Sequence, residues 1–196
     1  TDPSAATSQA VGVTLGAIAT NANGLSLLND LVGERNAADV DSVSDLNALA
    51  DAVNRLLVVA AGGTASPAFT AAELNALLGI STVTPENLAS VLAAIAASND
   101  LGSGIASLSN LQTLVASGVA AQTTALSTLS TYANSNTGTA PAESVYTTAG
   151  VTGLQGNATL LDAVNTALAS TPITGALVDT TAAVSYTHLT LPTNRE

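Results

Sequence analysis

The sequence predicts an all-α protein of tandem three-helix bundles, each about 70 residues long, with the last bundle incomplete. Three observations support this fold class: helix-forming residues dominate the composition, the chain repeats itself, and its apolar residues recur at helical spacing. The repeat predicts helical modules over residues 1–66 and 67–139, a truncated module over 140–183, and a tail over 184–196.

The composition favours helices with small side chains. Hydrophobic residues make up 47% of the 196 residues but aromatic residues only 2%, and Cys, Met and Trp are absent. Leu, Val, Ile and Ala must therefore fill the core, and because Ala buries little apolar area we expect modest stability per residue. Without Cys, the chain has no disulfide and no Cys-based metal site.

The charge is strongly acidic, with 14 Asp and Glu residues against three Arg and a net charge of −11. A nucleic-acid or anionic-membrane partner requires a basic stripe, which three Arg cannot form, so we expect neither partner. The longest apolar runs, 56–61 and 91–97, are far shorter than the roughly 20 residues of a membrane span, so we expect no membrane insertion. Residues 1–10 do not resemble a secretory signal, so an exported protein would contain this sequence as an internal piece.

The internal repeat rests on three sets of similar segments with one approximate period. The first set begins with glycines that are 67 and 71 residues apart. Polar stretches with Gly and Pro, at 61–67 and 134–141, are predicted linkers between the modules. The three sets are Gly12–Thr14 with Gly79–Ser81 and Gly150–Thr152; Ser42–Leu49 with Ser107–Leu114; and Val40–Ser42 with Val178–Thr180.

Helices are predicted in chain order from apolar spacing and from end signals. In the first module, Leu and Val at helical spacing predict one helix over 27–32 and a second over 46–56. In the middle module, Thr70 and Glu73 form a predicted capping box that begins a short helix. Gly79 is placed to end that helix as its C-cap.

Two further helices complete the predicted middle module. The first begins at 84–86, where Thr, Pro and Glu suit the N-cap, the first helical position and the positive first turn. The second is longer and begins near Ser107, with one apolar face that extends to Leu129. Gly118 weakens it by roughly 1 kcal/mol relative to Ala. In the last module apolar spacing predicts a helix over 160–168, and no stretch of the chain alternates strongly enough to predict a strand.

The tail over 184–196 differs from the rest of the chain. It contains the single His of the sequence, His188, together with Arg195 and the helix-breaking Pro192. Its sequence resembles translated read-through of a sequencing adapter at the end of an environmental gene fragment. We therefore exclude His188 from the candidate site residues, the alternative being a genuine C-terminal tail.

One acidic cluster is the candidate metal site. Asp39, Asp41 and Asp45 lie close together, and hard cations such as calcium bind carboxylates. The cluster lacks the loop Gly and the terminal Glu of an EF-hand, and it lies where the third helix of the first module begins. Acidic residues at that place cap a helix and interact with its dipole, so we favour the capping interpretation over a metal site. No nucleophile–base pair is found, so we expect no catalytic residue and no cofactor.

The segment Gly150–Gly156 is the only glycine cluster that suggests a phosphate loop. It lacks the Lys and the preceding strand of such a loop, and its first Gly coincides with the repeat, so we interpret it as a turn between helices. Tyr132 and Tyr146, near a predicted module border, are interpreted as packing groups between modules rather than as a ligand platform.

Two of the three Arg residues lie in the first module. We expect Arg35 and Arg55 to pair with nearby acids such as Glu34 or Asp51. Surface ion pairs of this kind contribute little to stability.

One part of the last module resembles a known group of repeats. Tyr146–Gly153, followed by Leu160–Asn165, is similar to the helical repeats of very large bacterial surface proteins, which are themselves similar to albumin-binding GA modules. The resemblance is best over 140–183, fair over 67–139 and weak over 1–66, where residues 15–24 resemble an insertion. It implies an extracellular or cell-surface, adhesin-like protein whose repeats act as spacers or interaction units, and it supplies no catalytic residues.

These observations give two functional hypotheses. In the first, the chain is a non-enzymatic spacer region whose partners are the neighbouring repeats of the same chain, and its acidity keeps a dense surface layer soluble. In the second, one helix face binds a host surface protein or a glycan. A large exposed patch of Leu, Val or Tyr would favour binding, whereas an exterior of Ser, Thr and Ala would favour the spacer. An enzyme would require a deep pocket lined by two or more acids.

Overall fold

A computed structural model describes residues 2–98 and 101–189 of the chain. Across these residues the structure is all-helical and has no strand, which confirms the predicted all-α class. The described residues form two compact units. Unit 1 comprises Thr1–Pro85 with Val91–Gly118, and unit 2 comprises Glu86–Ser90 with Val119–Glu196.

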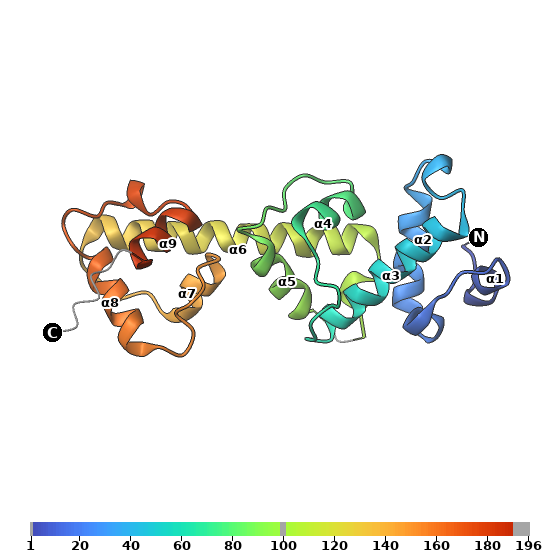
Figure 1. Cartoon of the computed structure of the whole chain (residues 1–196), viewed down its shortest axis with the longest axis horizontal. Helices are drawn as coiled ribbons and strands as arrows, with labels where there is room; N and C mark the ends of the chain where they lie inside the picture. The colour runs from blue at the N-terminus through green and yellow to red at the C-terminus, as the bar shows by residue number, and fades with distance from the viewer. Residues whose placement is uncertain (1, 99–100, 190–196) are drawn as a thin grey trace. The chain divides into compact units, whose positions relative to one another are not determined.

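Unit 1 is built mainly from helices, and some of their connections contain a short 3₁₀ helix (Figure 1). Its core contains the fully buried side chains of Leu27, Leu31 and Leu56. The elements of unit 1 are α1 (Ala5–Ala10), η1 (Gly16–Thr20), α2 (Ala22–Gly33), η2 (Ala37–Asp39), α3 (Val43–Ala60), α4 (Ala71–Leu78), most of α5 (Leu88–Ala96), η3 (Ser103–Ile105) and the first part of α6 (Leu108–Ser135).

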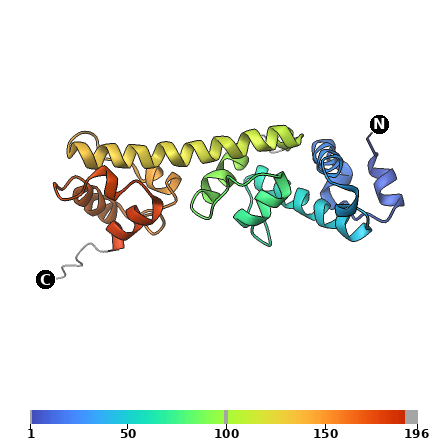
Figure 2. The ribbon, with the colours of Figure 1, turned by 90° about the horizontal axis from the view of Figure 1, so that it is seen from above.

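Unit 2 combines the second part of α6 with three later helices. These helices gather along that part of α6 in Figure 2. Buried side chains of α6, including Ala125 and Leu129, share one core with Tyr146, Val164 and Val184. The other elements of unit 2 are α7 (Glu143–Thr148), α8 (Ala158–Leu168), η4 (Gly175–Leu177) and α9 (Thr181–Leu189).

One order of elements occurs three times along the described chain. A short helix (α1, α4 or α7) is followed by a positive-φ glycine, a second helix, a 3₁₀ helix and a third helix; in the first occurrence η1 also precedes the second helix. The glycines are Gly12, Gly79 and Gly150, with φ values of 100°, 65° and 86°. Such φ values favour Gly because it has no Cβ, and at Gly150 an added Cβ would lie 2.5 Å from the carbonyl oxygen of Glu86. The boundary between the units falls inside α6 rather than at the predicted linker over 134–141.

The helix ends that were predicted from local signals are largely confirmed. Thr70 accepts a hydrogen bond from the Glu73 amide (3.1 Å) at the start of α4, and Gly79 ends that helix in the left-handed conformation. Ser107 caps α6 by accepting from the Asn110 amide (3.2 Å). By contrast, α5 begins at Leu88 rather than at 84–86, because a turn occupies 85–87.

Three features of the fold differ from the predicted list of helices. The short helices α1 and α7 and the 3₁₀ helices were not predicted, because six residues or fewer carry too little apolar periodicity. Helix α9 includes His188 and extends to Leu189, and Val184 is fully buried. The side chain of His188 and residues 190–196 of the predicted tail lie outside the described residues.

The core of unit 2 contains one aromatic residue with an internal hydrogen bond. Tyr146 is fully buried, and its hydroxyl donates to Asn165 Oδ1 (2.6 Å), while Asn165 Nδ2 donates to the carbonyl of Pro141 (3.1 Å). Burial raises the pKa of the Tyr146 hydroxyl, with a smaller contribution from Tyr132, so the group stays neutral and able to donate.

Replacing Tyr146 with Phe tests this arrangement. The change leaves the buried Asn165 oxygen without its donor, so we expect the free energy of unfolding to fall by about 1–3 kcal/mol. Urea denaturation followed by circular dichroism measures the loss. The matched control is Tyr132→Phe, because Tyr132 is only partly buried and its hydroxyl makes no hydrogen bond among the described residues. A loss of equal size in both variants would contradict the assigned role of the Tyr146 hydroxyl.

Candidate functional site

The acidic cluster lies at the start of α3, and part of it caps that helix. Asp45 completes a capping box: the Ser42 hydroxyl accepts from the Asp45 amide (3.2 Å), and the Asp45 carboxylate accepts from the Ser42 amide (3.1 Å). Asp39 accepts from Asn36 Nδ2 (3.1 Å). Asp41 is exposed. Within residues 2–98 and 101–189, no three His, Cys, Asp or Glu side chains are grouped so that they could hold a metal ion.

The glycine cluster over 150–156 is a turn between α7 and α8. Gly150, Gly153 and Gly156 all have positive φ, and a helix rather than a strand precedes them. The Gly156 amide donates to a carboxylate oxygen of Glu143 (3.1 Å), and the Gly153 amide donates to Gln155 Oε1 (2.8 Å). Because side chains of the same unit accept from these two amides, the loop resembles a helix connection rather than a phosphate cradle.

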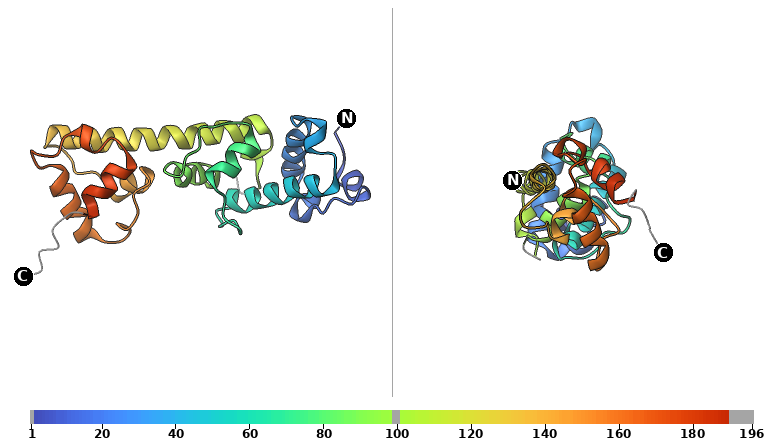
Figure 3. Two further views of the ribbon diagram at one scale, coloured as in Figure 1. Left: turned by 45° about the horizontal axis from the view of Figure 1, so that its top comes forward. Right: turned by 90° about the vertical axis from the view of Figure 1, so that its left-hand side faces the viewer.

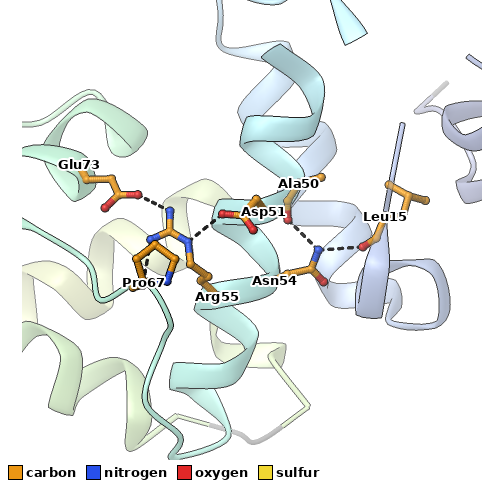
Figure 4. A network of polar contacts seen from close by, with 7 residues as sticks. All are labelled: Leu15, Ala50, Asp51, Asn54, Arg55, Pro67 and Glu73. Atoms are coloured by element: carbon orange, nitrogen blue, oxygen red, sulfur yellow. Dashed lines mark hydrogen bonds and ion pairs between the residues drawn. The ribbon is translucent and has the colours of Figure 1, made fainter. Parts of the chain in front are cut away.

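Arg55 is the centre of a polar network on α3 (Figure 4). Its side chain is buried, yet each part of the guanidinium has a partner: Nε donates to Asp51 (3.0 Å), Nη1 to the carbonyl of Pro67 (3.3 Å), and Nη2 to Glu73. The guanidinium carbon also lies 4.3 Å from the centre of the Phe69 ring. The predicted pair with Asp51 is confirmed, and three further partners come from the segment that follows α3.

The same network shifts the pKa values of its charged groups. The hydrogen bond from Arg55 is the main cause that lowers the pKa of the Glu73 carboxyl, and burial opposes it. The hydrogen bond to Glu73 likewise raises the pKa of Arg55. Glu73 therefore links α4 to α3 through Arg55. The capping signal at Thr70 does not predict this role.

Asn54 lies beside Arg55 on α3 and binds the main chain of the 15–20 segment (Figure 4). Its Nδ2 donates to the carbonyls of Leu15 (2.9 Å) and Ala50 (2.9 Å), and its Oδ1 accepts from the Ile18 amide (3.3 Å). Gly16 has φ of 58°, and a Cβ there would lie 3.0 Å from Asn54 Nδ2. The segment thus docks on α3 by main-chain contacts that the sequence pattern does not indicate.

The predicted pairing of Arg35 with Glu34 is wrong. Arg35 instead donates to the carbonyl oxygens of Ala76 (3.1 Å) and Leu77 (2.9 Å), in the last turn of α4. Carbonyls at this end of a helix have no partner within the helix and carry partial negative charge, so a cation binds there favourably. Arg35 is therefore a capping residue for a helix that lies 41 residues further along the chain.

The exterior of α6 carries no charge and no large apolar side chain. Every exposed position of this 28-residue helix is Ser, Thr, Ala or Asn. In unit 2 a groove of about 360 Å³ lies along it and is lined by hydroxyl groups, by Tyr132 and by Pro141. The hydroxyls of Thr124 and Thr128 donate to carbonyls one turn earlier (2.9 and 3.0 Å), so they face solvent as acceptors.

Comparison of the chain with models of known protein families, with curated proteins and with solved structures finds no match. In the described part of the chain, no helix combines the length and the apolar character needed to cross a membrane.

The lowered pKa of Glu73 predicts an acid dependence of stability. A carboxyl group with a folded-state pKa below its unfolded value of 4.5 contributes stability above that pH, and the contribution is lost as pH falls through the folded pKa. We therefore expect the free energy of unfolding of Glu73→Gln to depend less on pH than that of the wild type between about pH 5 and pH 3. Chemical denaturation at a series of pH values measures this.

The matched control for this experiment is Glu34→Gln. Glu34 is exposed and makes no ion pair in the described structure, so its variant removes one carboxyl group and leaves the contact between Arg55 and Glu73 in place. If the free energy of unfolding depended on pH in the same way for Glu73→Gln and for the wild type, protonation of Glu73 would not be coupled to folding, and the prediction would be wrong.

Proposed function

We propose that the chain is a non-enzymatic structural region of a large bacterial cell-surface or secreted adhesin-like protein. Tandem three-helix modules of about 70 residues would form a spacer, with neighbouring repeats of the same chain as their partners. The proposal rests on one observation: each long helix, α3 or α6, contacts the segment that follows it in the sequence. Arg55 of α3 binds the segment over 67–73, and Leu129 of α6 lies in one core with α7, α8 and α9.

The surface of α6 favours a spacer over a recognition surface. Binding sites for proteins are enriched in large aromatic, Met and Arg side chains, which can bury much area. The exposed positions of α6 hold Ser, Thr, Ala and Asn only. The exposed large apolar residues of the described chain, such as Leu101 (71%) and Leu177 (52%), are scattered over different segments. Such an exterior gives solubility without a strong adhesive patch.

The alternative function is a binding module for a host protein or a glycan. The hydroxyl-lined groove beside Tyr132 is the observation that favours it, because hydroxyl groups and an aromatic ring can both contact a sugar. The groove is lined by no charged residue, so such binding would depend on hydrogen bonds and stacking alone.

A binding screen separates the two functions. Labelled protein is applied to a glycan array and to immobilised serum and cell-surface proteins, and the spacer proposal expects no signal above that of an unrelated acidic helical protein. A ligand that binds the wild type and the exposed-position variant Thr113→Ala, but not Tyr132→Ala, would instead establish the groove as a binding site.

The repeat architecture is tested by the DNA of the source gene beyond codon 183. We expect the reading frame to continue into a long helix like α6, and a further Gly-Val/Ile-Thr/Ser anchor to occur about 70 residues after Gly150. A stop codon directly after Glu196 would make the tail genuine and would contradict an array that continues there.

A further inference from the structure

Unit 1 contains an apolar groove between α1, α2 and the start of α3, with a volume of about 300 Å³. The short helix α1 buries none of its residues, and Val11, directly after it, is 59% exposed. Helix α1 lies at the edge of unit 1 (Figure 3). The lining of the groove includes Pro3, Ser8, Val11, Leu28, Asn29 and Val32.

The helices that form this groove share local geometry with α7 and α8 of unit 2. Asn29 Nδ2 donates to the carbonyl of Pro3 (3.1 Å), and Asn165 Nδ2 donates to the carbonyl of Pro141 (3.1 Å). The residues that follow η2 and η4 have nearly equal φ and ψ, −142° and 28° against −140° and 27°. One local arrangement of short helix, turn and longer helix is therefore present in both units.

In unit 2 the corresponding positions are covered. Tyr146, Ala149, Val164 and Leu168 all have 0% exposure. They share their core with Ala125, Leu129 and Ala133, which lie one turn apart on the second part of α6. The shared glycine and the shared Asn–Pro hydrogen bond align these four residues with Ser8, Val11, Leu28 and Val32 of unit 1. Leu28 is already buried, with 4% exposure, whereas Val11 is 59% exposed and Ser8 and Val32 are half-buried.

In unit 1 a long helix also contacts the segment that follows it. The second half of α3 lies against the segment that contains α4 and α5, where Val59 lines the same small cavity as Phe69 and Leu92. Arg55 adds its contacts to Phe69 and Glu73. Each of the two longest helices thus contacts the segment that follows it, whereas the described structure contains no long helix over α1.

We propose that the groove beside α1 binds the second half of a long helix of the α6 type, supplied by another repeat of the same kind. The occupant is an uncharged amphipathic helix. Its buried face carries a small residue, a Leu and a second small residue one turn apart, as Ala125, Leu129 and Ala133 are in α6; we call this row of residues the seam. The seam packs against the exposed Val11 and the half-buried Val32, as Ala125, Leu129 and Ala133 of α6 pack in the core of unit 2. This inference rests on the proposed function, because the array of repeats is what would supply the helix.

The charge of the molecule is compatible with this occupant. The chain has a net charge of −11, so an acidic helix would be repelled and a charged group in the groove would lose its hydration. Helix α6 contains no charged residue, and Asp2 is the only charged residue among those that line the groove. A helix of the α6 type therefore brings apolar surface and no charged side chain of its own into the groove.

The test grafts that helix onto the full chain. A copy of residues 119–140 replaces residues 1–2, so that the copy precedes Pro3 with the spacing that α6 has before Pro141. Linkage raises the effective concentration of a segment that is too short to be a stable helix alone. We expect amide hydrogen exchange in α1 to slow by at least about tenfold, and nuclear Overhauser contacts to form from the inserted Leu129 to Val11 and Val32.

Two variants of the graft make the outcome decisive. Leu129→Asn in the inserted copy places a polar group in the seam and should abolish the added protection, whereas Ser127→Asn, on the exposed face of the original helix, should retain it. Unchanged exchange in α1 would overturn the inference, and so would equal protection from both variants. Either result leaves the repeat array intact if the source gene continues into further repeats, so the two proposals fail separately.

Discussion

Two short helices of this chain, α4 and α7, are each contacted by the second half of the long helix that precedes them. Helices α4 and α7 have eight and six residues, which is too short to be stable alone in water. Tyr146 of α7 is buried in one core with Ala125 and Leu129 of α6, and Glu73 of α4 binds Arg55 of α3. In both cases the long helix precedes the short helix in the sequence. This coupling makes stability a property of neighbouring segments rather than of isolated bundles.

The network around Arg55 shows how such a contact tolerates a buried charge. Removing a guanidinium from water is costly unless its donors and its charge are matched. Asp51 on the same helix, Glu73 on α4 and the carbonyl of Pro67 accept from it, and the Phe69 ring lies against its face. Most of these partners belong to the following segment, so the charge is matched only when that segment is folded against α3. The contact thus favours one register of docking over alternatives.

The parts of the structure that the sequence predicts are those that depend on neighbouring residues. The left-handed end of α4 at Gly79, the capping role of Asp45 and the pair of Asp51 with Arg55 all follow from spacings of a few residues. The interactions of Arg35 and Glu73 were not predictable in this way. Their partners lie 41 and 18 residues away, so they depend on which helices meet rather than on local propensity.

A core of Ala, Leu and Val poses a further problem of specificity, because small and similar side chains allow helices to slide past one another with little loss of contact. Side-chain amides supply the missing constraint here. Asn54, Asn29 and Asn165 each bind a carbonyl of a separate segment, and in unit 2 Asn134 binds the Gly175 amide (2.7 Å) while Gln122 binds the hydroxyl of Thr181 (3.0 Å). A shift of one helical turn would break these bonds and leave partly buried polar groups unpaired. The free energy lost in this way is larger than the difference in apolar contact between the two registers. The apolar residues therefore determine that the helices associate, and the amides determine their register.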